Sequence, residues 1–478
     1  MSSPFNEQKY KGLLEGLEVS EVKLSELLNY EDNENFRIDS DFFKKEFVFL
    51  ETAIKKTEWD YLGNLSKTIV NFGAYSLCNF IEFVDAGVPY LNVADIKENI
   101  INWENAKKIK KELSLGMLHK SLAIENQVLL TIAGTIGNAS VAYKLPQFTN
   151  SNQAIANITT KDTLNPFYLS TYLNSRFGKS QTKKLTISSV QPNILLTQVK
   201  RIKIPVLPLH FQGQVEKMVK NAHSIREQSQ QLYRQAEELL LKTIGLSDFK
   251  PSQEGKNIKS FKESFLSTGR LDAEYYQPKY EEIIEKIKEQ PHELLVNLVS
   301  ITKSIEPGSD FYDEVGVPFV RVADYNKFGM SAPDKYLSDI FCQANTELIE
   351  NLKPKEETIL FTKDGSVGNA YMLREDANFI TSGAVLHLTV KNKKRILPEY
   401  LTLVLNSQVV QMQAERDAGG SIILHWRVSE IENVVVPVVD YSIQQQIAGL
   451  IEESFALRKE SEQLLEEAKG MVEREIEK

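Results

Sequence analysis

Two short glycine motifs have the residue types and spacing to hold a phosphate group. GTIGNA occupies residues 134–139 and GSVGNA occupies residues 365–370. Glycine-rich phosphate loops usually lead from a strand into a helix N-terminus. Both motifs instead lie between strand-like stretches, such as LLTIA before and SVAYKL after the first of them. We therefore expect a turn between two strands, with glycines at positive φ, rather than a phosphate site.

Other patterns that would support catalysis are not found in the sequence. The nearest match to the Asn-Pro-Pro-aromatic motif of adenine methyltransferases is NPFY at 165–168, which lacks the second proline and is typical of a helix start. No loop ends in the Gly-Lys-Ser/Thr that ATP hydrolysis requires. The histidines have no metal-ligand spacing, and Cys78 and Cys342 cannot form a CxxC zinc site. We expect no active site, metal or cofactor in this chain.

The composition is that of an ordinary globular protein. The chain has 478 residues, of which 42% are hydrophobic and 25% charged, enough for several domains. A formal net charge of −9 argues against a uniformly basic nucleic-acid-binding surface, but not against local basic patches. There is no apolar run of about twenty residues and no signal peptide, so we expect a cytoplasmic location.

The chain contains an internal duplication. Besides the glycine motif, RIDSDFF at 37–43 returns as RLDAEYY at 270–276, and GVPYLNVAD at 87–95 returns as GVPFVRVAD at 316–324. YLNS and the stretch VKRIKIPVLPLHFQGQV at 199–215 also recur, and all five pairs keep their order at offsets of 229 to 233 residues. A period of this length is the size of a domain. Abundant β-branched and aromatic residues with Gly, Asn and Pro between them predict short strands and turns in the front part of each copy.

Each copy ends in a long predicted helix with small and apolar residues at alternating steps of three and four, the pattern of a coiled coil. The first seam is Val215, Met218, Ala222, Ile225, Ser229, Leu232, Ala236 and Leu239, and the second is Ile447, Leu450, Ser454, Leu457, Ser461, Leu464, Ala468 and Met471. We expect the two helices to pack as an antiparallel coiled coil with pseudo-twofold symmetry, a rod of roughly 45–50 Å. The alternative, in which each helix packs on its own domain, is less favoured because such helices show a wider apolar face.

The predicted fold class is α+β, with two tandem β-rich domains that are each followed by a long helix. The expected parts are an N-terminal segment at 1–36 that closes the pseudo-symmetric ring, a first domain at 37–208, a helix at 209–246, a linker at 247–269, a second domain at 270–440 and a helix at 441–478.

Loops of both copies carry side chains that could contact nucleic acid. Basic clusters can neutralise phosphates, and Arg, Lys, Asn, Gln and Ser can read base edges, although charge runs also occur on ordinary solvated loops. The predicted contact residues are Asn92, Lys107, Lys108, Ser151, Asn152, Gln153, Lys183, Lys184, Ser188 and Gln191 in the first copy, and Arg321, Lys363, Asp364, Ser382, Arg416, Ser421, His425 and Arg427 in the second. We expect Lys363 and Asp364 to lie closer to the bases than the neighbouring glycines.

The duplicated order of GTIGNA/GSVGNA, VPYLNVAD/VPFVRVAD and IPVLPLHFQGQV resembles the specificity subunits of type I restriction–modification systems, over nearly the whole chain. One departure is that the usual PPLxEQ lead into the helix reads LPLHFQGQ and VVDYSIQQQ here, although Gln212 and Gln444 keep a polar helix start. The resemblance implies that each β-rich domain is a target recognition domain for one half of a bipartite DNA site, and that the helices set the spacing.

The resemblance also implies partners. Two methyltransferase subunits, and possibly restriction subunits, would bind this non-catalytic chain, and S-adenosylmethionine, ATP and Mg would bind to those partners. Two alternatives remain open from the sequence. One is a coiled-coil scaffold that does not bind DNA, and the other is the recognition component of a standalone adenine methyltransferase.

Overall fold

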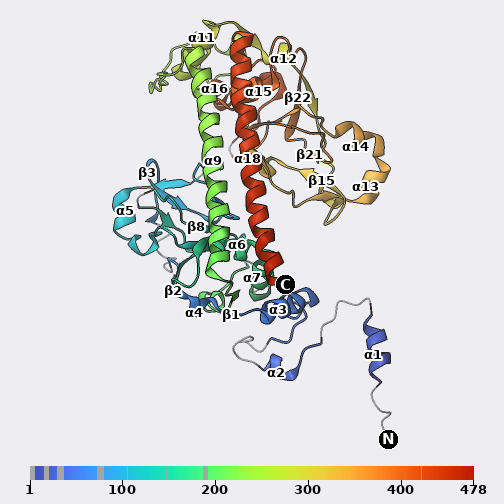
Figure 1. Cartoon of the computed structure of the whole chain (residues 1–478). Helices are drawn as coiled ribbons and strands as arrows, with labels where there is room; N and C mark the ends of the chain where they lie inside the picture. The colour runs from blue at the N-terminus through green and yellow to red at the C-terminus, as the bar shows by residue number, and fades with distance from the viewer. Residues whose placement is uncertain are drawn as a thin grey trace. The chain divides into compact units, whose positions relative to one another are not determined.

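The chain forms a mixed helix-and-sheet structure, described in a computed structural model for residues 6–15, 21–28, 37–72, 80–104, 106–146, 148–186, 192–420 and 422–478. It divides into two compact units (Figure 1). The first unit comprises 1–226 and 459–478, and the second comprises 227–458. The long helices α9 (Leu209–Thr243) and α18 (Tyr441–Ile476) each contribute to both units. The sequence predicts different boundaries, in which each long helix lies entirely within one segment.

A four-stranded antiparallel sheet forms the centre of the first unit. Its strands follow the order β2-β10-β7-β8, with β2 at Ser66–Val70, β10 at Ile155–Thr160, β7 at Val128–Thr131 and β8 at Ala139–Val141. Every residue of β7 and β8 is buried. Helix α6 (Pro166–Asn174) packs against β8, and eight of its nine residues are buried.

The first unit also contains smaller elements. The further strands are β1 (Trp59–Tyr61) paired with β11 (Lys203–Pro205), β4 (Ile96–Lys97) paired with β5 (Ile100–Ile101), and β6 (Lys107–Ile109), β3 (Phe83–Leu91) and β9 (Asn150–Ser151) in one sheet. The helices are α1 (Glu7–Leu14), α2 (Leu24–Leu27), α3 (Lys45–Lys56), α4 (Leu62–Leu65), α5 (Lys111–Leu115), α7 (Arg176–Leu185) and α8 (Leu196–Val199), with 3-10 turns at Val93–Asp95 and His119–Ser121.

The second unit repeats the central sheet with the same connectivity. The order is β13-β22-β19-β20, with β13 at Val299–Lys303, β22 at Val385–Val390, β19 at Ile359–Thr362 and β20 at Ala370–Met372. Helix α15 (Pro398–Asn406) packs on β20 as α6 does on β8. The duplication seen in the sequence thus has a counterpart in the strand order of the two units.

The remaining elements of the second unit follow a similar plan. The strands are β12 (His292–Leu294) paired with β23 (Val435–Pro437), β16 (Tyr325–Asn326) paired with β17 (Gly329–Met330), and β14 (Tyr312–Asp313), β18 (Tyr336–Leu337), β15 (Val317–Val320) and β21 (Ile380–Thr381) in one sheet. The helices are α10 (Phe265–Thr268), α11 (Pro278–Lys288), α12 (Leu295–Leu298), α13 (Asp339–Ala344), α14 (Thr346–Leu352), α16 (Gln408–Asp417) and α17 (Val428–Ile431), with 3-10 turns at Ser309–Phe311 and Val322–Asp324.

A buried glutamine ties the start of each long helix to its own unit. The Gln212 side chain accepts a hydrogen bond from the Asn165 N–H at 2.8 Å and donates one to the Leu207 carbonyl at 2.7 Å. Gln444 makes the equivalent bonds, accepting from the Leu397 N–H at 3.0 Å and donating to a carbonyl at 2.8 Å. Gln212 and Gln444, the polar residues kept at the helix starts, therefore satisfy backbone groups that would otherwise be buried without partners.

The buried stripe of each long helix is wider than the predicted two-position seam. The first seam position of every heptad is buried, whereas the second, represented by Met218, Ile225, Leu232, Leu239, Leu450, Leu457, Leu464 and Met471, is only half-buried. The residue after it is buried at most of these places, as at Val219, Tyr233, Leu240, Ile451, Arg458, Leu465 and Val472. The strict a/d prediction was too narrow because each helix packs on a domain as well as on a helix.

Small seam residues bring the two helices close together within each unit. In the first unit the Ser461 hydroxyl donates to the Ala222 carbonyl at 2.8 Å. In the second unit the Ser454 hydroxyl donates to the Ser229 carbonyl at 2.7 Å. Serine and alanine leave room for these contacts, which larger side chains would block.

A buried histidine in the second unit predicts a pH dependence of stability. The His387 ring of β22 lies 2.8 Å from the Thr381 hydroxyl, and burial lowers the pKa of His387 to about 4. Between pH 6.5, near the pKa of histidine in an unfolded chain, and pH 4, the unfolded chain binds more protons than the folded one. Lowering the pH from 7 to 4.5 should therefore cost about 2 kcal/mol of unfolding free energy through this residue.

Urea unfolding of the native chain and of His387→Gln at the two pH values measures this effect. The variant should lose less stability on acidification by that amount. A matched His292→Gln variant, at an exposed position, should behave like the native chain. Equal acid sensitivity of the native chain and His387→Gln would exclude the titration of His387 as the cause.

Candidate nucleic-acid interface

Both glycine motifs form the turn between two adjacent antiparallel strands, and the predicted positive φ angles are confirmed. Gly134 and Gly137 have φ of 74° and 85° between β7 and β8, and Gly365 and Gly368 have φ of 74° and 82° between β19 and β20. A Cβ on Gly137 would lie 2.7 Å from the Thr182 hydroxyl of α7. Glycine is therefore required both for the turn and for the close approach of a helix.

The Asn-Ala end of each motif is held by an asparagine, which is buried in the first unit and partly buried in the second. The Ala139 N–H donates to the Asn174 side-chain oxygen at 2.9 Å, and the Asn174 amide donates back to the Ala139 carbonyl at 2.7 Å. Ala370 and Asn406 repeat both bonds at 3.0 and 2.8 Å. The motif thus fixes the turn on the following helix, α6 or α15, in each unit.

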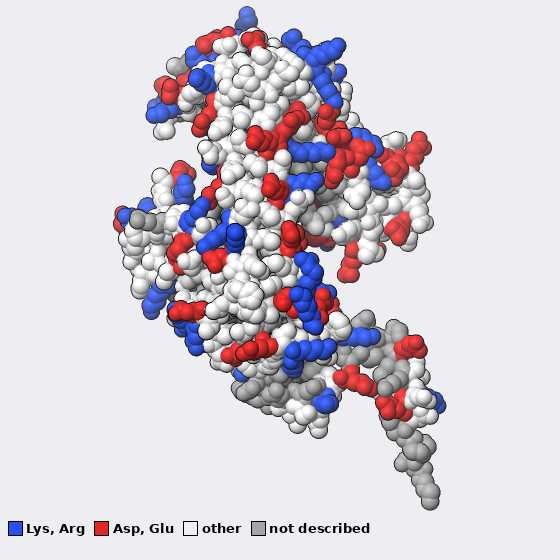
Figure 2. Space-filling model, in the orientation of Figure 1, with Lys and Arg blue, Asp and Glu red and all other residues white. Residues whose placement is uncertain are grey.

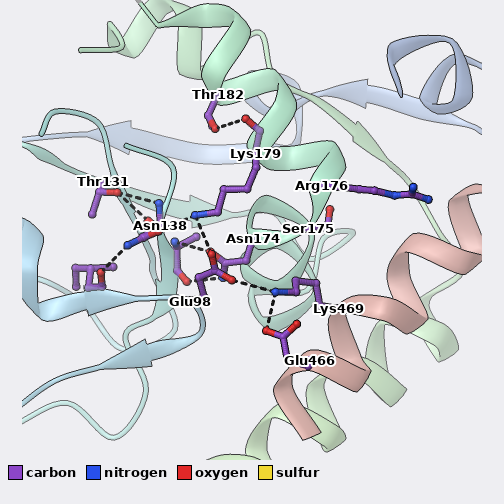
Figure 3. Close-up of polar contacts among 12 residues, drawn as sticks. Glu98, Thr131, Asn138, Asn174, Ser175, Arg176, Lys179, Thr182, Glu466 and Lys469 are labelled. Carbon is purple, nitrogen blue, oxygen red and sulfur yellow. Dashed lines mark hydrogen bonds and ion pairs between the residues drawn. The ribbon is translucent and has the colours of Figure 1, made fainter. Parts of the chain in front are cut away.

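In the first unit, ionic contacts extend from this turn to α18 (Figure 3). The Lys179 ammonium donates to the Asn138 side chain at 2.6 Å and lies 3.1 Å from the Glu98 carboxylate. Glu98 also pairs with Lys469 of α18 at 3.1 Å. Burial raises the pKa of the Glu98 carboxyl, but the two ammonium groups outweigh burial and hold the pKa below its ordinary value.

A hollow of about 490 Å³ opens beside the first glycine turn, and we call it the basic hollow. Its wall includes Arg37, Asp41, Lys44, Phe47, Gly134, Ile136, Lys179, Thr182, Lys183, Lys184, Thr186 and Pro192. The side chains of Lys44 and Lys183 are 45% and 68% exposed, and each is paired with an exposed carboxylate, Asp41 at 3.1 Å and Glu46 at 3.5 Å. Exposed pairs of this kind are weak, so a phosphate could replace the carboxylate at little cost.

Lys184, in contrast, is a structural residue rather than a free phosphate ligand. Its ammonium lies 2.6 Å from Glu51, which also binds Lys203 at 2.6 Å, and these side chains are largely buried. Burial raises the pKa of the Glu51 carboxyl, but the two lysines more than compensate and keep the pKa well below its usual range. The pattern KK at 183–184 could not separate the two roles, because neighbouring residues of a helix face different sides.

Three predicted residues of the second unit meet beside its glycine turn. The His425 ring nitrogen lies 2.9 Å from the Asp364 carboxylate, the Lys363 ammonium pairs with the same carboxylate, and the Gly365 N–H donates to the Leu424 carbonyl at 2.9 Å. His425 is 65% exposed. The loop before α17 and the turn therefore present these polar groups together.

Two other predicted contact residues, Ser151 and Ser382, are buried, and Arg416 is half-buried, which corrects the sequence-based prediction. The Ser151 hydroxyl donates to the Asn157 side chain at 3.0 Å, and Ser382 is also buried. Arg416 binds Asp417 at 2.7 Å and lies over the Tyr275 ring. The polar side chains of Ser151 and Arg416 satisfy partners inside the fold, a role that sequence position alone does not reveal.

The remaining predicted residues are at or near the surface. Asn92 and Asn152 are half-buried and joined by a hydrogen bond of 3.4 Å, Gln153 is half-buried, and Arg321 pairs with Asp334. Lys107 and Lys108 are exposed on β6, and Arg427 is exposed and pairs with Glu430. Ser188, Gln191 and Ser421 lie outside the described residues.

Sequence reasoning missed several residues of these surfaces. Arg37, Lys44 and Lys179 line the basic hollow, and the recurrence of Arg37 at Arg270 was the available signal for the first of them. In the second unit Ile422 is 95% exposed and Ile423 also faces solvent, in the loop that leads to His425. The short apolar run after two glycines marks this loop in the sequence.

Charges of both signs are interspersed on the visible face of the molecule (Figure 2), in keeping with the net charge of −9. Within the described ranges, no group of three His, Cys, Asp or Glu side chains could hold a metal ion. No helix in that part of the chain is long and apolar enough to cross a membrane. The class of protein is thus a mixed α+β scaffold with a repeated sheet and charged groups beside each repeated turn.

Comparison with known proteins finds similar proteins for part of this chain. Residues 296–467 match the family model of the type I restriction modification DNA specificity domain. The EcoBI specificity subunit of Escherichia coli, a type I restriction enzyme, is 25% identical over 216 residues, which cover 42% of this chain and 44% of that relative. The match therefore spans less than half the length of the relative. The predicted resemblance is confirmed for residues 296–467, which match the domain model of this family.

Two solved structures are also similar. The S subunit of a type I restriction-modification system from M. genitalium is 14% identical with a TM-score of 0.38, and the alignment covers 88% of this chain and 96% of that one. The HsdS subunit from Thermoanaerobacter tengcongensis is 14% identical with a TM-score of 0.27, and the same shares are covered.

Proposed function

We propose that this chain is the DNA sequence-specificity subunit of a type I restriction–modification complex. The observation that carries the proposal is the basic hollow beside the first glycine turn, in which Lys44 and Lys183 face solvent in weak ion pairs. Cations held at a rigid turn can position a DNA backbone, while loops next to them read base edges. In the second unit, the cluster of Lys363, Asp364 and His425 occupies the place beside the equivalent turn.

The two units would be tandem target recognition domains, and each would read one half of a bipartite site. Their identical central strand order supports this assignment. The helices α9 and α18 would form the antiparallel, pseudo-twofold coiled coil that sets the distance between half-sites. A rod of this length suits half-sites about one helical turn, roughly 34–36 Å, apart on the duplex.

The chain itself would carry out no catalysis. In the proposed complex it would act in the cytoplasm and position two methyltransferase subunits, and restriction subunits where these are present. S-adenosylmethionine, ATP and Mg would be bound by those partners. The glycine turns pack against helices and do not form open phosphate-binding loops, which supports a non-catalytic role for this chain.

The test is a charge reversal in the basic hollow. We expect Lys44→Glu combined with Lys183→Glu to weaken binding of the full DNA site roughly 10- to 100-fold at low salt and to reduce the slope of log K against log salt by about 2. Mapping of methylated adenines in cells with and without the chain defines the site, and fluorescence anisotropy of the complex with labelled DNA measures the binding.

The matched control is Lys97→Glu combined with Lys120→Glu, two exposed lysines of the same unit that do not line the hollow. This variant makes the same change in net charge, so it should lower affinity much less. Unchanged DNA affinity of the hollow variant, with thermal unfolding like that of the native chain, would rule out the basic hollow as a DNA contact.

A further inference from the structure

Each unit contains an ion pair between its β-rich domain and a long helix, and the two pairs have opposite polarity. In the first unit Glu98 pairs with Lys469 of α18 at 3.1 Å. In the second unit Lys327 pairs with Glu237 of α9 at 3.2 Å. All four side chains are between 21% and 42% exposed, so both pairs are partly withdrawn from water.

The internal repeat shows that the two pairs occupy equivalent positions. Glu98 and Lys327 each stand three residues after the aspartate that ends the repeated VAD sequence. Lys469 and Glu237 each stand 25 residues after the buried glutamine at the helix start. The same contact is thus made twice, with acid and base exchanged between domain and helix.

The neighbouring contacts also differ between the units. In the second unit, the Phe328 ring packs edge-on against Tyr233 of α9 at 4.9 Å, and the Lys327 ammonium lies over both rings. The equivalent residues of the first unit are Asn99, whose side chain is hydrogen-bonded to Thr171 and Ser170, and Leu465. An aromatic contact in one unit therefore replaces an amide and an aliphatic side chain in the other.

We propose that these reversed contacts determine which helix each β-rich domain accepts. The domain of the first copy pairs with the far part of α18, and the domain of the second copy pairs with the far part of α9. If like halves of two chains paired instead, Glu98 would face Glu237, and Lys327 would face Lys469. Like charges at a partly buried contact disfavour that arrangement, so the chain pairs with itself rather than with a second copy. This inference does not depend on DNA binding.

The test exchanges the acid and the base of the second-unit ion pair in the full-length chain, so that both units have the acid on the domain and the base on the helix. Glu237→Lys or Lys327→Glu alone places like charges together and should lower the melting temperature by roughly 2–4 °C. The double variant Glu237→Lys/Lys327→Glu restores an ion pair and should recover most of that loss. It also makes the wrong pairings complementary, so the dimeric fraction after refolding from urea, measured by light scattering, should rise several-fold above that of the native chain.

Two further variants separate this effect from a general one. The neutral double variant Glu237→Gln/Lys327→Gln removes the ion pair without making the wrong pairing attractive, so its dimeric fraction should stay below that of the reversed variant. Reversing the exposed pair Lys286–Glu289 of α11 should leave the dimeric fraction unchanged. The proposal is overturned if the reversed double variant refolds with the dimeric fraction of the native chain, or if the α11 control raises that fraction equally.

Discussion

Replacing Glu51 by glutamine is expected to lower the free energy of unfolding of the first unit by about 3–5 kcal/mol. The Glu51 carboxylate, on α3, binds the ammonium groups of Lys184 and Lys203 at 2.6 Å each. The Lys203 side chain is only 6% exposed. Because the lysines remain in place, the variant leaves two positive charges together in a site from which water is largely excluded.

The contacts of Glu51 with the two lysines also predict a loss of stability in acid. The pKa of Glu51 is lower in the folded chain than in the unfolded chain, because the lysines stabilise the carboxylate. Its contribution is therefore complete above the unfolded pKa of about 4.3 and is lost as the pH falls towards the lower folded value. The glutamine variant lacks this part of the acid sensitivity.

Urea unfolding of the full chain, followed by a signal from the first unit, tests this prediction. The matched control is Glu46→Gln on the same helix, where the carboxylate pairs with exposed Lys183 at 3.5 Å. The control should change the unfolding free energy by less than about 1 kcal/mol. Similar effects of the two substitutions would show that the buried site does not need its carboxylate.

Replacing Asn174 by leucine is expected to destabilise the first glycine turn, at a cost of about 1–3 kcal/mol. The buried amide of Asn174 satisfies both the N–H and the carbonyl of Ala139. Leucine has a similar size but no hydrogen-bonding group, so the Ala139 N–H loses its partner, while the Ala139 carbonyl keeps only the bond from the Asn99 N–H at 2.9 Å. The Asn406→Leu variant should have a comparable effect on the second unit, because Asn406 makes the same bonds to Ala370.

Hydrogen exchange measures this effect locally. The Ala139 amide should exchange much faster in Asn174→Leu, while the Ala370 amide keeps its native protection, and Asn406→Leu should show the reverse. The control is Asn64→Leu, in which the exposed Asn64 side chain donates to the Asp60 carboxylate in the native chain. If both amides keep native protection in their respective variants, the asparagines do not fix the turns.

Several features of the protein could be predicted from its residues because they depend on local geometry or on the repeat. The glycine pairs required positive φ between strand-like stretches, and the structure has a turn at both places. NPFY predicted a helix start, and α6 begins at Pro166 with Asn165 as its cap. The duplicated order of motifs pointed to the specificity-subunit family, and residues 296–467 match its domain model.

The interface residues could be predicted only in part, because a loop sequence does not show which side chains face inward. Lys183 and Lys184 look alike in the sequence, yet one is exposed on the basic hollow and the other is buried on Glu51. The Ser151 and Arg416 side chains have partners inside the fold, and Ser382 is buried. Lys44 and Lys179 line the same hollow but lie far apart in the chain, so no local sequence pattern revealed them.

The sequence by itself determined the duplication, the turns, the long helices and the resemblance to a family, because each of these follows from the spacing of residues along the chain. Tertiary structure alone decided which charges face solvent and which face each other. The clearest case is the pair of contacts Glu98–Lys469 and Lys327–Glu237, whose partners are separated by hundreds of residues in one unit and about ninety in the other. Their opposite polarity cannot be seen in the sequence, because folding is what brings these equivalent positions of the two copies into contact with the helices.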